Sequence, residues 1–331
     1  MNNRHLVIEQ GGSRAILTGL GATLAIKLAG LKSWSSIGGI SGGAIPALLL
    51  ADNADPLRII ETTMALDFLK LLRPASGDTG PLRSFATELD GKRSVAHKFI
   101  ARLLRRGMRH TDGLGELIDA QVKEWPESFW TMALTENSHI LFTASGVFEY
   151  GFDGSYNVLS EEPAPLSLAI RATCAIPGLL EAVPYMGRFL FDGALSPLGG
   201  CPASVVQQHF MGAEGTIVRV ASTGKDSRKN NFLCRVGRKL LCHDSDRIEL
   251  ADDGKADINI NAHVAEVHAM RFRLTEGQKV AGLLAGFNAA VFELSAHSHA
   301  FQEGLNPLSH CADFGQLVAL VRGFVSSQGL A

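Results

Sequence analysis

The sequence predicts a three-layer α/β/α sandwich built around a mostly parallel sheet. Short apolar segments typical of buried strands alternate with longer segments in which apolar residues recur at helical spacing. A β-loop-α-β-turn-α order within the first fifty residues is typical of a parallel sheet covered by helices. The chain has 331 residues, of which 46% are hydrophobic and 19% charged, so it is long enough for one large domain of this class.

The first fifty residues supply two strands and two helices. Residues His5–Glu9 predict a buried strand that runs into a glycine pair. A helix is expected from Ser13, its predicted N-cap, to Leu31. A short strand follows at Trp34–Ile37, and the turn GGISGG then leads into an apolar helix from Ala44 to about Asp52.

The segment from Pro56 to Pro126 differs in character, because it is rich in charges and carries the turn signals PASGDTGP and TDGLGE. We interpret residues 56–126 as a helical insertion and as a candidate cap over the site. Later strands are predicted at His139–Ala144, Arg188–Phe191, Thr216–Ala221 and Ile258–Ile260, and later helices at Gly277–Ala296 and Gly315–Ser326. No repeat or low-complexity linker interrupts the sequence, so a single domain over residues 1–331 is the economical interpretation.

Composition and charge exclude several classes of protein. The formal net charge of −2 leaves no overall nucleic-acid footprint. No uninterrupted apolar run reaches the roughly 18–20 residues that cross a bilayer, and we expect Ala15–Leu31 and Val280–Leu294 to be buried helices. The first ten residues lack the apolar stretch and cleavage site of a secretory signal. We expect a cytoplasmic protein, peripheral at membranes, with signal-less secretion as an effector left open.

Neither a metal nor an organic cofactor is expected. The five cysteines are odd in number and form no C-x-x-C pair, which favours reduced core thiols over a disulfide framework or a zinc ribbon. His263 and His268 are five residues apart, whereas metalloprotease histidines stand at i and i+4. The acidic residues of Asp244–Asp246 and Asp252-Asp253 lack the glycine and terminal glutamate of a calcium loop.

Two basic stretches interleave cations with apolar residues, at Lys98–His110 and Arg228–His243. The first has the composition of a helix that lies on an anionic lipid surface. A solvated helix face packed on the domain explains it slightly better. If the protein acts at a bilayer, this helix is the first candidate for docking it there.

The pentapeptide Gly39-Ile40-Ser41-Gly42-Gly43 matches G-x-S-x-G. Its glycines allow a sharp turn between strand and helix and clear space around the Ser41 hydroxyl. The N-terminus of the following helix points at the serine and favours negative charge there. A tight strand–helix turn without catalytic function has the same pattern, but the position between a predicted strand and helix is the setting that a nucleophile needs.

A second glycine pair, Gly11-Gly12, follows the neighbouring predicted strand. Loops that follow neighbouring parallel strands share the carboxyl edge of the sheet. We therefore expect the backbone N–H groups of Gly11, Gly12, Ser13 and Gly42 to form an oxyanion hole for an acyl group held at Ser41. Arg14 either stiffens this loop, holds an anionic headgroup or lies at the surface.

These segments resemble patatin-like phospholipases and lysophospholipases. LVIEQGGSRA and IGGISGGAIPALLLA are similar to that family's G-G-G-x-R-G loop and its G-x-S-x-G turn. RATCAIPGLLEAV and GRFLFDGALSP resemble its A-x-x-A-x-P segment and its D-G-[GA] motif, and LTEGQKVAGLLAGFNAAVFEL resembles its C-terminal helix. The likeness extends from about residue 5 to 295, with the motifs in the family's order.

The resemblance implies a serine acyl hydrolase acting on phospholipids or lysophospholipids through a direct Ser–Asp dyad. Carried over by position, the dyad is Ser41 and Asp192, and Gly193 and Ala194 complete the second motif. A carboxylate within hydrogen-bond reach can accept the hydroxyl proton as the oxygen attacks. Gln10 and Ala15 replace two glycines of the family's loop, which bears on the oxyanion hole. The implied partner is a lipid or membrane surface; an activating partner and the oligomeric state stay open.

Two other readings compete. An α/β-hydrolase with a Ser-Asp-His triad also uses G-x-S-x-G, and histidines are present downstream at positions 209, 243, 263, 268, 297, 299 and 310. That fold normally builds several strands before its nucleophile, and the glycine loop before Ser41 has no counterpart there. The second reading is a catalytically impaired, lipid-binding protein of the same fold, for which Gln10 is the one sequence feature.

Overall fold

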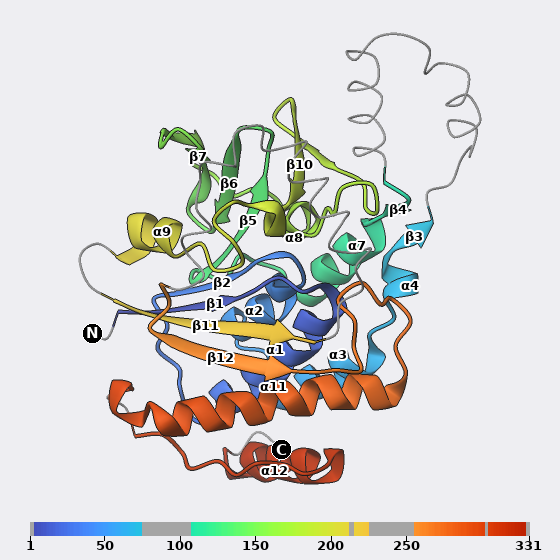
Figure 1. The fold of residues 1–331 in the computed structure, drawn as a ribbon, viewed down its shortest axis with the longest axis vertical. Coiled ribbons are helices and arrows are strands. Elements are labelled where there is room, and N and C mark those ends of the chain that lie inside the picture. Colours follow the sequence, from blue (N-terminus) through green and yellow to red (C-terminus); the bar gives the residue numbers. More distant parts are fainter. Residues whose placement is uncertain (1–2, 75–106, 212–214, 225–254, 302–303, 329–331) are drawn as a thin grey trace.

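The centre of the molecule is a ten-stranded sheet (Figure 1). The computed structural model describes residues 3–74, 107–211, 215–224, 255–301 and 304–328. The main path of the sheet runs β12-β11-β1-β2-β5-β6-β7-β8, and β10 pairs with both β5 and β9. The strands are β1 (Arg4–Ile8), β2 (Ser36–Gly39), β5 (Phe129–Leu134), β6 (Ser138–Thr143), β7 (Gly146–Gly151), β8 (Tyr156–Ser160), β9 (Val183–Tyr185), β10 (Arg188–Asp192), β11 (Thr216–Thr223) and β12 (Ile258–His263).

Five strands, β12-β11-β1-β2-β5, are parallel, as the fold class predicts. From β5 the sheet continues as an antiparallel meander through β6 and β7 to β8. The sequence did not predict β5, β7 or β8. Antiparallel neighbours need only short turns between them, so this half of the sheet lacks the strand–helix alternation that predicts parallel strands.

Helices cover both faces of the sheet. In the described part of the chain they are α1 (Gly12–Leu28), α2 (Ala44–Ala51), α3 (Pro56–Ala65), α4 (Phe68–Leu71), α7 (Asp112–Gln121), α8 (Leu166–Thr173), α9 (Ala203–Val206), α11 (Glu276–Ala296) and α12 (Phe314–Ser327). Successive strand residues point to opposite faces. Leu6 and Ile8 therefore join the core that contains α1 and α11, whereas Val7 and Trp130 join the core that contains Val205 of α9.

Helix α1 lies buried between the sheet and α11, and glycines bring these helices together. A Cβ on Gly21 would lie 2.0 Å from the Leu283 carbonyl oxygen, and one on Gly286 would lie 1.9 Å from that of Thr18. Helix α11 has the length and apolar composition of a membrane span. Its face towards α1 is packed through buried residues that include Leu283 and Phe287. The prediction of a buried helix at Val280–Leu294 holds for this face only, because Phe292 is 61% exposed. Helix α1, whose N-terminus follows the Gly11-Gly12 pair, is therefore held along its length between the sheet and α11.

The insertion predicted at residues 56–126 includes α3, α4, α7 and a two-stranded sheet of β3 (Arg73–Pro74) and β4 (Arg109–His110). Residues 75–106, with most of the first basic stretch, lie outside the described residues, as do residues 225–254 with the second. Of the cysteines, Cys174, Cys201 and Cys311 are buried thiols, as predicted; Cys234 and Cys242 are not among the described residues.

Candidate active site

Ser41 occupies a sharp turn between β2 and α2. Its φ angle is +53°, in the left-handed region that costs a non-glycine residue roughly 1–2 kcal/mol. The flanking glycines of the motif are sterically required. A Cβ on Gly39 would lie 2.4 Å from the Ala44 Cα, and one on Gly43 would lie 2.2 Å from the Ile8 carbonyl oxygen. The turn thus has the strained, glycine-flanked geometry expected from the pentapeptide.

Asp192 lies at the end of β10, 151 residues away in sequence, and meets Ser41 directly. The Ser41 hydroxyl donates a hydrogen bond of 2.7 Å to Asp192 Oδ2. The second carboxylate oxygen accepts a 2.8 Å bond from the Ala194 N–H. Both side chains are buried. Within the described residues the Ser41 hydroxyl contacts this carboxylate and no histidine, which removes the support for a Ser-Asp-His triad.

The pairing of β10 with β5 brings Asp192 to the serine. Asp192 lies opposite Ala133 in the antiparallel register of these strands, and β5 is the parallel neighbour of β2, which leads into Ser41. A side chain at Gly193 would collide with β5, because its Cβ would lie 2.3 Å from the Met132 carbonyl oxygen. The glycine of the D-G-A motif therefore permits this close approach.

Burial raises the pKa of Asp192 to about 7. The hydrogen bonds from Ser41 and Ala194 favour the charged form and act in the opposite direction, without overcoming the loss of hydration. A carboxylate with a pKa near neutrality can both take and return a proton at that pH. The carboxyl group that accepts the Ser41 hydrogen bond is therefore able to exchange a proton near neutral pH.

The glycine loop and the serine turn are in contact. A Cβ on Gly42 would lie 2.3 Å from the Gly12 carbonyl oxygen. Gly11 and Gly12 both have positive φ, and no side chain caps α1 at this end. In the part of the chain that the structure describes, the N–H groups of Gly12 and Gly42 have no hydrogen-bond acceptor. The residue that follows Ser41 therefore packs against the Gly12 peptide, and each of these two glycines has a backbone donor without an acceptor among the described residues.

Two predictions for Ser13, as the N-cap of the first helix and as an oxyanion-hole donor, are wrong. Its side chain does not cap α1, because it lies inside the helix and its hydroxyl donates to the carbonyls of His268 and Ala269. Its backbone N–H also donates to Ala269, at 2.9 Å, and is not free for an oxyanion. The carboxyl end of β12 leads into the 264–269 loop, which only the folded sheet brings to this position.

Arg14 is buried against the end of β11. Its Nε lies 3.4 Å from Ser222 Oγ, and its Nη2 lies 3.4 Å from the Ser222 carbonyl oxygen. The prediction that Arg14 lies at the surface is therefore wrong. Its contacts favour a role in stiffening the Gly11-Gly12 loop. Gln10 lies against the loop that follows Asp192: a Cβ on Gly200 would lie 2.0 Å from Gln10 Oε1.

Replacing Gly12 with alanine is expected to destabilise the protein by about 2–4 kcal/mol and to impair activity. Gly12 has a φ of +54°, and its Cβ would lie 2.0 Å from the Ala269 carbonyl oxygen, so strain and a backbone collision add. Urea unfolding measures the change. Gly154→Ala is the matched control, because its φ is +85° and nothing lies within 4 Å of its Cβ. Equal losses in the free energy of unfolding for the two variants would contradict the predicted collision with Ala269.

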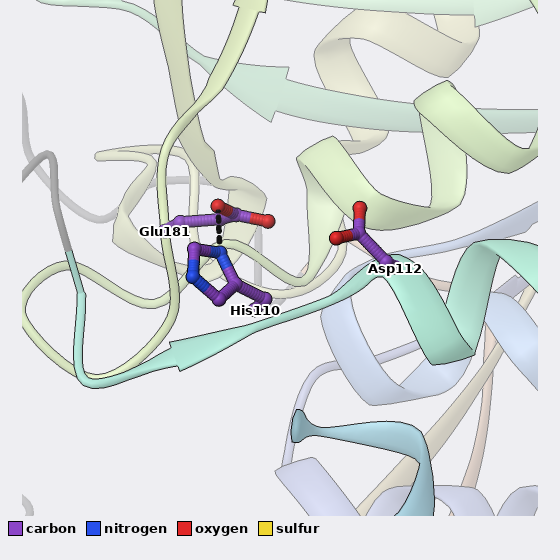
Figure 2. Close-up of side chains that lie close together, drawn as sticks. All are labelled: His110, Asp112 and Glu181. Carbon is purple, nitrogen blue, oxygen red and sulfur yellow. Dashed lines mark hydrogen bonds and ion pairs between the residues drawn. The ribbon is translucent and has the colours of Figure 1, made fainter. Parts of the chain in front are cut away.

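Among the residues that the structure describes, one cluster has the side chains of a metal site. Figure 2 shows the His110 and Glu181 side chains meeting, with the Asp112 carboxylate on the neighbouring helix start. Arg171 Nη2, however, lies 3.1 Å from Glu181 and 2.9 Å from Asp112. The arginine already supplies the positive charge that a metal ion would bring. The cluster is an ion-pair network that joins α7 to α8.

A cavity of about 550 Å³ lies away from Ser41. Its lining includes Lys27, Trp34, Ser128 and Phe324. Trp34 precedes β2 and Ser128 precedes β5, so the cavity opens at the amino ends of these strands. Ser41 follows the carboxyl end of β2, and this cavity is therefore not its substrate site.

Three comparisons bear on the identity of the fold. A sequence model described as "Patatin-like phospholipase" matches residues 6–200. The crystal structure of VipD from Legionella pneumophila matches with a TM-score of 0.50 at 14% identity, over 90% of this chain and 67% of VipD. That of the type III effector protein ExoU has a TM-score of 0.39 at 15% identity, over 99% of this chain and 60% of ExoU. No curated protein sequence matches. At this identity the likeness to VipD shows the fold alone.

Proposed function

The chain belongs to the patatin-like phospholipase family, and on that premise we propose that it is a serine hydrolase of phospholipid or lysophospholipid esters. Ser41 is the nucleophile and Asp192 is its base. The observation that carries this proposal is the buried 2.7 Å hydrogen bond from the Ser41 hydroxyl to Asp192 Oδ2. The pKa of about 7 for Asp192 supports the same roles.

In the first half of the proposed reaction, Ser41 Oγ attacks the ester carbonyl carbon and its proton passes to Asp192. The carbonyl oxygen becomes an oxyanion beside the N–H groups of Gly12 and Gly42, with Gly11 in the same loop. Collapse of this intermediate breaks the bond to the alcohol oxygen, which takes the proton from Asp192. An acyl group remains on Ser41.

In the second half, a water molecule gives a proton to Asp192 and attacks the acyl carbon. The same backbone donors stabilise the second oxyanion. The bond to Ser41 Oγ then breaks, the proton returns from Asp192 to Ser41, and the fatty acid leaves. Each proton taken by the carboxyl group is returned within the cycle, so the reaction requires no cofactor.

The value of kcat/KM is expected to rise as the pH increases through about 7. The carboxylate form of Asp192 accepts the serine proton, and burial raises its pKa to about 7, so acid removes the base. Well below that pH the rate should fall about tenfold per pH unit. Fatty-acid release between about pH 5 and 9 at constant ionic strength measures the profile. A midpoint near the ordinary carboxyl pKa of about 4 would contradict the assignment.

The proposed function is tested by esterase assays combined with active-site labelling. The protein should hydrolyse a short p-nitrophenyl ester and release fatty acid from vesicles of phosphatidylcholine or lysophosphatidylcholine. A fluorophosphonate should become attached to Ser41, as identified by peptide mass spectrometry. Labelling on another serine, or no hydrolysis of any of these substrates, would contradict the proposal.

A further inference from the structure

The C-terminal end of α8 contacts both members of the proposed dyad. Thr173, the last residue of this helix, accepts a 2.9 Å hydrogen bond on Oγ1 from the backbone N–H of Ser41. Two residues later, the Ala175 carbonyl accepts a 2.9 Å bond from the Asp192 N–H. A single short segment therefore holds the backbones of two residues that lie 151 positions apart.

The Thr173 hydroxyl is also tied to the sheet. It donates a 2.7 Å bond to the Met132 carbonyl oxygen of β5, and its side chain is fully buried. Because its proton is committed to Met132, an oxygen lone pair is directed at the Ser41 N–H. The chain of bonds runs from Ser41 through Thr173 to Met132, and Gly193 packs on the same carbonyl.

This contact meets a specific need of the serine turn. Ser41 has a φ of +53°, which a non-glycine residue adopts only where its surroundings enforce it. A hydrogen bond to the N–H of that residue restrains the same backbone. The bond also occupies the Ser41 N–H, which leaves Gly12 and Gly42 as the donors for an oxyanion.

We infer that Thr173 is a positioning residue that holds the strained Ser41 backbone and thereby sets the distance between the Ser41 hydroxyl and Asp192. Its hydroxyl bonds to the Ser41 amide and the Met132 carbonyl, whereas the Ser41 hydroxyl bonds to Asp192. Its catalytic consequence rests on the proposed function of Ser41, whereas its hold on the Ser41 amide does not.

Three variants test this role. Thr173→Val keeps the shape of the side chain but removes the acceptor for Ser41 and the donor to Met132. Thr173→Ser keeps the hydroxyl. Thr63→Val is the matched control, because Thr63 is a fully buried threonine whose hydroxyl donates to the Ile59 carbonyl within α3.

The first readout is hydrogen exchange of the peptide that contains Ser41, followed by mass spectrometry. Thr173→Val should speed exchange at the Ser41 amide about fivefold relative to Thr63→Val, and Thr173→Ser should restore the slow rate. This measurement needs no enzymatic activity. Unchanged exchange in Thr173→Val would overturn the inference even if the protein is a fully active hydrolase.

The second readout is steady-state ester hydrolysis. Thr173→Val should lower kcat about tenfold to a hundredfold, because the nucleophile is misplaced, while KM changes less than about twofold. Thr173→Ser should recover most of that loss. A rise in KM with kcat unchanged would overturn the positioning role. An equal fall in kcat in Thr63→Val would overturn it as well. If the wild-type protein hydrolyses no ester, the proposed function fails, and the exchange experiment still decides whether Thr173 holds Ser41.

Discussion

Ser41→Ala is expected to reduce kcat for ester hydrolysis by about 10⁴-fold or more, because the acyl-enzyme can no longer form. The Ser41 hydroxyl is the group that donates to Asp192. Its removal leaves the backbone donors of Gly12 and Gly42 in place. Some residual acceleration over water from those donors is therefore expected. Release of p-nitrophenol in enzyme excess measures it.

Ser295→Ala is the control for this experiment. Ser295 lies on α11, and its hydroxyl donates to the Val291 carbonyl of the same helix. This variant should keep wild-type kcat and wild-type fluorophosphonate labelling, whereas Ser41→Ala should lose both. Retention of more than about a tenth of the wild-type rate by Ser41→Ala would contradict the assignment of the nucleophile.

Asp192→Asn is expected to lower kcat by about 10³- to 10⁴-fold. The asparagine carbonyl can still accept the Ala194 N–H, so the loop keeps its anchor. Its amide, however, donates towards Ser41 instead of accepting, and the serine proton has no base. The residual rate should also lose the rise with pH through about 7.

The same substitution should stabilise the protein at neutral and alkaline pH. The folded-state pKa of Asp192 is raised from 3.8 to about 7, so its contribution to stability is present below about pH 4 and is lost as pH rises through about 7. At about 1.4 kcal/mol per pKa unit the loss is on the order of 4 kcal/mol. Urea unfolding of the wild type and Asp192→Asn at about pH 5 and 9 should therefore show the variant gaining relative stability at the higher pH.

Asp153→Asn is the control, because Asp153 is exposed in the turn between β7 and β8. It should leave kcat nearly unchanged, as well as the difference in stability between about pH 5 and 9, because hydrogen bonds from Ser155 lower the pKa of Asp153 and it stays charged over that range. A Ser41→Ala variant without activity beside a fully active Asp192→Asn variant would point to another base. That outcome would support the hypothesis of a Ser-Asp-His triad, and the histidines would then be substituted one by one.

The sequence by itself determined the parts of the site that depend on neighbours along the chain. The G-x-S-x-G spacing predicts a sharp strand–helix turn at Ser41, since adjacent glycines and apolar periodicity specify the local backbone. It also predicts the glycine loop at residues 11–12 and the parallel strands that place both at one edge. The D-G-A motif identified Asp192 only through the family resemblance, because an Asp-Gly pair also occurs in ordinary turns.

Only the tertiary structure decided which side chains meet. The strand β5 escaped prediction, yet its pairing with β2 and β10 brings Asp192 to Ser41 across 151 residues. Thr173 carries no local signal for its role, because its partner depends on how α8 packs on the sheet. The loop after β12 likewise removed Ser13 from the oxyanion hole. Local spacing specifies backbone conformation, whereas long-range hydrogen bonds and the desolvation that raises the pKa of Asp192 arise only when distant segments pack together.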